Sequence, residues 1–136
     1  MILLIAFSGC GLFNEKYTFK TRLNEIQSIE VVELGVFDQE SLKFFETSLS
    51  EPLDVEVLKE ELLALDCGDN WGDPQELCEG DIVFKIKYNN GDFDLVGWRA
   101  QLKHRSGRYS NGYMVFNESE FMQLIGKYTN TLRYDE

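Results

Sequence analysis

The sequence predicts an α+β fold: one domain over residues 17–136, with a mainly antiparallel sheet and two amphipathic helices. Short runs of alternating apolar and polar residues are joined by Asn-Gly turns, which is typical of antiparallel hairpins. Two other segments repeat apolar residues at helical spacing. A chain of 136 residues with 43% hydrophobic residues is long and apolar enough to bury one core.

The first predicted strands lie at residues 17–23 and 26–34. The alternation in YTFKTRL indicates a half-buried strand. In IQSIEVVEL the adjacent Val31 and Val32 indicate a strand that is covered on both faces or carries a bulge. We expect the two strands to pair around Asn24 and Glu25, and LKFFETSL, residues 42–49, to form a further strand.

An amphipathic helix is predicted in DVEVLKEELLALDC, residues 54–67. Its apolar residues fall at steps of three and four and define one face, opposite a face of Glu and Lys. Gly68 is placed to end this helix. The residues of the apolar face are Val55, Leu58, Leu62 and Leu65.

The clearest hairpin signal is DIVFKIKYNNGDFDLVGWRAQL, residues 81–102. Apolar residues alternate with Lys85 and Lys87 up to Asn90-Gly91, a pair that favours a type I′ turn. After the turn the alternation changes phase, Gly97 suits a bulge, and Trp98 is expected in the core.

The last third of the chain is predicted to hold a polar loop, a strand and a helix. KHRSGRYSNG, residues 103–112, is the loop, and its second Asn-Gly pair indicates another hairpin before the strand YMVF. Asn117 is the expected N-cap of the final helix, with Glu120 three residues later. The buried stripe of that helix is Phe121, Leu124, Ile125 and Tyr128.

The N-terminus places an apolar run directly before Ser8, Gly9 and Cys10. The run is too short to cross a bilayer, which takes about 20 residues, and it resembles the end of a bacterial lipoprotein signal. That resemblance implies a signal peptide at residues 1–9, a lipid on Cys10, and an anchor and tether at residues 10–16. The alternative is a buried N-terminal strand with a free thiol.

The other two cysteines, Cys67 and Cys78, flank the turn-rich segment GDNWGDPQEL. Export to an oxidising compartment predicts a disulfide between them. A zinc site is the rival interpretation, but the chain has one His and no CxxC spacing, so we expect no metal.

The N-terminal pattern, the acidic body and the segments IVFKIKYNNGDFDLV and YMVFNESEFMQLIGKY together are similar to small uncharacterised lipoproteins of Gram-positive bacteria. The resemblance implies a location on the outer face of the cell membrane. It carries over no catalytic residue and no cofactor.

The net charge of −11 makes nucleic acid an unexpected partner and favours a protein partner with a basic surface. Trp71 is a candidate contact residue, unless it folds back over the core. The single basic cluster is a second candidate, unless it is a solvated hairpin loop. Its residues are Lys103, His104, Arg105 and Arg108.

No common nucleophile, phosphate-binding or metalloprotease motif is present in the sequence. We therefore expect a non-enzymatic, lipid-anchored binding domain of the cell envelope. The alternative function is an inhibitor or immunity-type protein that neutralises a basic toxin or enzyme with its acidic surface.

Overall fold

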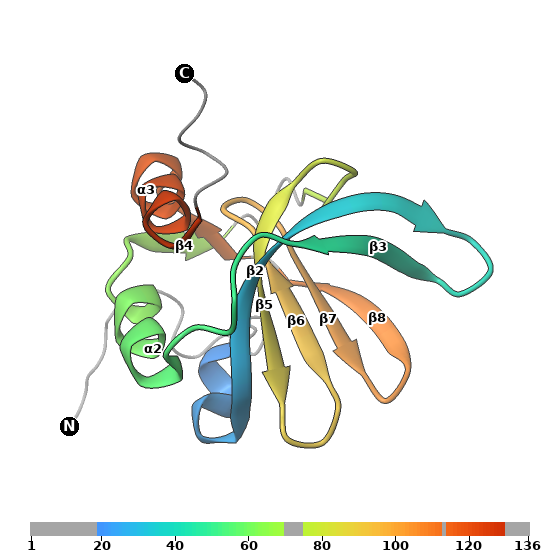
Figure 1. Ribbon diagram of the computed structural model, residues 1–136, viewed down its shortest axis with the longest axis horizontal. Helices are drawn as coiled ribbons and strands as arrows, with labels where there is room; N and C mark the ends of the chain where they lie inside the picture. Colours follow the sequence, from blue (N-terminus) through green and yellow to red (C-terminus); the bar gives the residue numbers. More distant parts are fainter. Residues whose placement is uncertain (1–18, 70–74, 113, 130–136) are drawn as a thin grey trace.

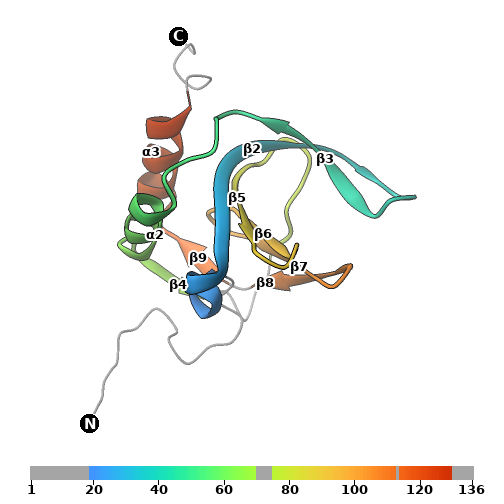
Figure 2. The ribbon, with the colours of Figure 1, turned by 60° about the horizontal axis from the view of Figure 1, so that its bottom comes forward.

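Six strands form one antiparallel, curled sheet, and both α-helices lie on one side of it (Figures 1 and 2). The computed structural model describes residues 19–69, 75–112 and 114–129. Strand order in the large sheet is β3-β2-β5-β6-β7-β8, and β4 pairs with β9 in a small second sheet. The predicted α+β class, mainly antiparallel and with two α-helices, is therefore confirmed.

The elements follow one another along the chain with short connections. They are the 3-10 helix η1 (Phe19–Glu25), β2 (Ile26–Asp38), β3 (Lys43–Ser48), α2 (Val55–Leu63), β4 (Cys67–Asp69), β5 (Ile82–Tyr88), β6 (Phe93–Val96), β7 (Gln101–Arg105), β8 (Arg108–Gly112), β9 (Met114–Phe116) and α3 (Glu118–Tyr128).

The main core lies between the sheet and the two helices. Leu58 and Leu62 of α2 and the buried stripe of α3 pack against the side chains of β2 and β5 on this face. Phe121 contacts Phe84 and Phe116 with ring centroids 5.5 and 5.3 Å apart. Burial of apolar area of this kind is the main stabilising contribution to a small domain.

Both predicted helices form, with their predicted buried residues. Asn117 caps α3 by accepting a hydrogen bond from the Glu120 N–H at 3.0 Å. The N-cap of α2 is Asp54, and this helix ends at Leu63, before the expected Gly68. The Glu61 carboxylate joins the two helices because it accepts hydrogen bonds from Lys127 and Tyr128.

The strand predicted at residues 17–23 is wrong where the structure describes it, because residues 19–25 form η1. Phe19 is fully buried, and Arg22 bonds Glu25 three residues later, a spacing that suits a helical turn. The predicted pairing around Asn24 and Glu25 is absent. The strand at 26–34 does form, and both Val31 and Val32 are buried, one on each face of the sheet.

The turns differ from their predicted types. The Asn90-Gly91 hairpin forms, but only Gly91 has a positive φ, of 96°. Tyr88 N–H donates to Asp92 O, so the loop has three residues and its glycine adopts the left-handed conformation. The consecutive positive φ angles that a type I′ turn requires occur instead at Ser106 and Gly107.

Residues 97–112 therefore fold differently from the prediction. The chain reverses at Gly97, whose N–H bonds Ala100 O at 2.9 Å, so the expected bulge is a turn between β6 and β7. The expected polar loop is the hairpin β7-β8, and Asn111-Gly112 lies within β8. The predicted strand at 42–49 is confirmed as β3.

Candidate functional site

The curled sheet encloses a hollow of about 570 Å³, here called the mouth. Its walls come from parts of the chain that are far apart in sequence: the outer ends of β2 and β3, the segment before β5, and strands β7 and β8. The lining residues are Phe37, Phe44, Glu76, Leu77, Cys78, Glu79, Leu102, Tyr109, Ser110 and Asn111. Figure 2 shows the segment before β5 curving between β3 and the β7-β8 hairpin.

The mouth combines an apolar floor with negative charge. Leu77, Leu102 and Phe44 pack on the second core cluster, which is formed by Val32, Leu34, Val83 and Leu95. Among the lining residues the charged side chains are Glu76 and Glu79, and both are exposed. The volume lies within the range of about 300 to 1,000 Å³ that is usual for ligand sites. The mouth suits a group with an apolar body and a positive charge.

An aromatic stack supports the side of the mouth at β6, β7 and β8. His104 lies parallel to Phe93, with ring centroids 4.5 Å apart, and Tyr109 meets His104 edge to face at 4.8 Å. Lys85 lies over the other ring of this group, 4.7 Å from the Phe93 centroid, and bonds Glu46 of β3 at 2.7 Å. The stack fixes Tyr109 where it lines the mouth.

A buried polar cluster holds the opposite face of the same strands. The Asp94 carboxylate is fully buried and accepts hydrogen bonds from the Tyr88 hydroxyl at 2.5 Å and from Arg105 at 2.8 Å. The Arg22 and Arg105 guanidiniums both lie over the Tyr88 ring, at 4.3 and 5.3 Å from its centroid. Burial raises the pKa of Asp94, against the opposing effect of Arg105 and Tyr88, and burial also raises the pKa of Tyr88.

Asp92 extends this cluster to the hairpin turn. Its carboxylate accepts hydrogen bonds from the Ser106 N–H at 3.0 Å and from Arg22 at 2.8 Å. The bond from the Ser106 N–H and the contacts with Arg22 and Asn90 lower the pKa of Asp92 to about 2. Both carboxylates with strongly perturbed environments therefore hold the frame of the sheet and do not line the mouth.

The predicted basic cluster is divided by the pleat of β7. Lys103 and Arg105 alternate with His104, so they lie on opposite faces of the sheet, and Arg105 is occupied by Asp94. Arg108 is exposed at the start of β8. The structure thus brings only His104 of this group near the mouth, through its contact with Tyr109. Trp71 and Cys10 lie outside the described residues.

The predicted disulfide between Cys67 and Cys78 is not formed in the structure, because Cys78 is an exposed free thiol. Cys67 opens β4 in the small sheet, where it is paired with Phe116. The backbone N–H of Cys78 bonds the Asp81 carboxylate at 2.8 Å, in the turn that leads into β5. The fold therefore directs the two cysteines to separate places.

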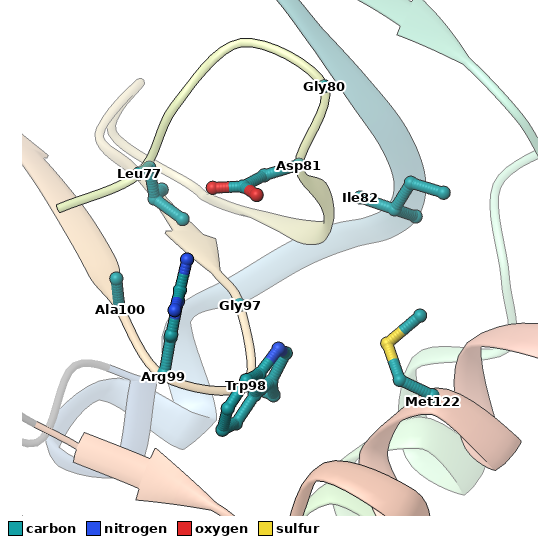
Figure 3. A pocket seen from close by; sticks show the side chains of 9 residues that line it. All are labelled: Leu77, Gly80, Asp81, Ile82, Gly97, Trp98, Arg99, Ala100 and Met122. Atoms are coloured by element: carbon teal, nitrogen blue, oxygen red, sulfur yellow. The ribbon is translucent and has the colours of Figure 1, made fainter. Parts of the chain in front are cut away.

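A second, smaller hollow of about 190 Å³ lies where the turn at Gly97 meets α3. Figure 3 shows the Trp98 ring, the Arg99 side chain and Met122 around it, with Asp81 on the far rim. Asp81 already accepts the Cys78 N–H, and Arg99 lies over the Trp98 ring at 5.6 Å. This hollow is smaller than most ligand sites and its charged groups have intramolecular contacts, so the mouth is the better candidate.

Four residues of the mouth were not predicted as site residues: Phe37, Phe44, Glu76 and Glu79. In the sequence Phe44 belongs to a predicted strand, and the two glutamates belong to the general acidic excess. The available signal was the pair Phe44-Phe45, because adjacent large apolar residues in an edge strand cannot both face one core. Their convergence depends on the curl of the sheet.

Two further properties complete the described part of the chain. None of the helices described is long and apolar enough to span a membrane. Over residues 19–69, 75–112 and 114–129, no group of three or more His, Cys, Asp or Glu side chains is placed to hold a metal ion.

Comparison of the chain with protein-family models, with curated protein sequences and with solved structures finds no match.

Proposed function

We propose that this chain is a non-enzymatic binding domain, anchored through a lipid on Cys10 to the outer face of the cell membrane, whose ligand is a protein with a basic surface. The mouth is the proposed binding site. The observation that supports this best is the pairing of an apolar floor with Glu76 and Glu79 in a chain of net charge −11. Complementary charge raises the rate and specificity of encounter, while apolar contacts stabilise the complex.

A binding role is favoured over catalysis by the positions of the perturbed carboxylates. Asp92 and Asp94 are the acids whose surroundings differ most from water, and arginines hold both within the sheet. A general acid or base has to reach a substrate in a cleft. In this fold the groups that reach the mouth are exposed glutamates, a tyrosine and a thiol, which suit recognition.

The first experiment tests the site. The purified chain is immobilised and used to capture proteins from envelope extracts of its native host. We compare it with a Glu76→Gln/Glu79→Gln variant and with the charge-matched control Glu51→Gln/Glu60→Gln, whose residues are exposed around α2. We expect a basic protein in one-to-one ratio, reduced about tenfold by the variant at the mouth and unchanged by the control. Equal recovery with both variants would overturn the proposed site.

The second experiment tests the anchor. Mass spectrometry of the mature protein from its native host is expected to show cleavage before Cys10 and a diacylglycerol on its sulfur. Recovery of an intact Met1, or of Cys10 as a free or disulfide-bonded thiol, would contradict the anchor. The binding role of the mouth would stand or fall on the first experiment alone.

A second candidate function is an inhibitor or immunity-type protein, favoured by the acidic rim of the mouth. The two functions differ in what binding does to the partner. Stoichiometric loss of the captured partner's own activity, relieved in the Glu76→Gln/Glu79→Gln variant, would identify the inhibitor. Capture without any loss of the partner's activity would favour the binding domain.

A further inference from the structure

Strand β3 presents an unpaired edge. It is the last strand in the sheet order and pairs only with β2, and five of its six residues are exposed. Figures 1 and 2 show β3 and the outer end of β2 projecting away from the helices as a hairpin arm. We define the arm as residues 35–46. A strand edge carries unpaired N–H and C=O groups that can bind another extended segment.

The arm has little support from the rest of the fold. β2 pairs with β5 as far as Glu33, and Leu34 bonds the backbone of Gly80 and Asp81. From Gly35 onward its strand partner is β3. A two-stranded hairpin is marginally stable in water. An additional strand on β3 would give the arm the third strand that it lacks.

Apolar side chains occupy both faces of the arm. Phe37 and Phe44 meet edge to face at 5.1 Å and line the mouth. On the other side an extra residue in β2 places Gly35 and Val36 opposite Phe45. The exposed fractions of Val36, Leu42 and Phe45 are 55%, 56% and 63%. A cluster of exposed apolar side chains on a protruding element marks an interaction surface.

The charges around the arm define what can bind there. Residues 33–48 contain the acidic residues Glu33, Asp38, Glu40 and Glu46 and a single basic residue, Lys43. A second copy of the chain would bring the same acidic excess and a further net charge of −11 to the contact. Like charges that face each other across an interface are unfavourable. The arm therefore favours a strand that carries Lys or Arg beside apolar residues.

We infer that the edge of β3 binds an extended segment of the partner as an added antiparallel or parallel strand, rich in Lys or Arg and apolar residues. This inference rests on the proposed function and adds its mode of recognition. In this mode the backbone of β3 supplies hydrogen bonds, and side chains on the two faces of the added strand cover Phe45 and extend toward the mouth beside Phe44. The same partner then contacts the arm and the mouth.

The probe is a blocked heptapeptide in which lysine and valine alternate, added to the full-length chain. Amide hydrogen exchange followed by NMR is the readout. We expect exchange within β3 to slow about tenfold, because an added strand protects the edge amides. Two control peptides keep the length: one has glutamate in place of lysine, and one is N-methylated at alternate residues, which removes backbone donors. Each is expected to bind about tenfold more weakly.

A variant pair separates the arm from general apolar contact. Phe45→Thr keeps a residue suited to a strand and is expected to weaken the lysine peptide about fivefold. Val57→Thr, at a position 46% exposed on α2, is the control and is expected to leave binding unchanged. A hydrogen-exchange map of each variant without peptide verifies that the sheet is intact.

Three results would overturn the inference. If protection appears only at Leu102 and Tyr109 and N-methylation has no effect, the peptide binds in the mouth without strand addition, and the proposed function survives. If no lysine peptide binds while capture of the native partner still depends on Glu76 and Glu79, β3 is not the docking edge. If sedimentation shows a dimer that Phe45→Thr abolishes, the occupant is a second copy.

Discussion

The two ends of strand β2 lie in opposite surroundings. The first part, through Leu34, is bonded on both sides and contributes Ile29, Val31, Val32 and Leu34 to the two core clusters. The last part, from Gly35, belongs to the arm and exposes Val36 beside Phe45. One continuous strand thus serves two roles. Apolar residues in the first part stabilise the fold, whereas those in the arm are available to another molecule.

The largest expected effect contrasts the same substitution in the two surroundings. Phe121→Ala removes a fully buried ring that contacts Phe84 and Phe116, so we expect the free energy of unfolding to fall by about 3 to 5 kcal/mol. Phe45→Ala on the arm is expected to change it by about 0.5 kcal/mol or less. Urea denaturation measures both. Equal losses would show that the arm is part of the folding core.

The next effect concerns the buried carboxylate that joins β5, β6 and β7. Asp94→Asn removes the charge opposite Arg105 and leaves the Tyr88 hydroxyl with a weaker acceptor, so we expect a loss of about 2 to 3 kcal/mol. Glu60→Gln on the exposed face of α2 is the control and should be neutral. A neutral Asp94→Asn variant would mean that the cluster is not needed for stability.

The smallest effect is a pH dependence carried by Asp92. Its folded pKa of about 2 lies below the unfolded value of about 3.9, so its contribution is present above pH 4 and is lost as the pH falls from about 4 to 2. We expect the wild type to be more stable than Asp92→Asn by up to about 2 kcal/mol at neutral pH.

The difference between these two proteins isolates Asp92 from the other carboxylates. Asp94 opposes it, because a raised folded pKa makes proton uptake favour the folded state as the pH falls. Denaturation of both proteins at pH 7, 4 and about 2.5 should show the gap closing at acid pH. A gap that stays constant would rule out the assigned role of Asp92.

Local pattern was sufficient wherever one side of an element faces the core. The helix with Leu58 and Leu62, the helix capped by Asn117, and the hairpin with Ile82 to Tyr88 all follow from periodicity, capping and turn chemistry. Pattern failed at residues 19–25 and 97–112. There the decisive contacts are long-range: Arg22 with Asp92, and Arg105 with Asp94.

The candidate site was not predictable for a related reason. The sequence placed its candidates on Trp71 and on the basic run around His104, whereas the mouth depends on which side chains the curled sheet brings together. Alternation along β7 sends Arg105 to the buried cluster and His104 to the Phe93 ring. Only the register between β7 and β8 decides that Tyr109 is opposite His104 and lines the mouth.

The sequence by itself determined the fold class, the two helices, the main strands and the acidic character of the chain, because each depends on composition or on neighbours a few residues apart. The tertiary structure decided the buried arginine pairs, the free Cys78, the mouth and the projecting arm. These depend on strand order and sheet curvature, which bring together residues that are dozens of positions apart and leave no local trace in the sequence.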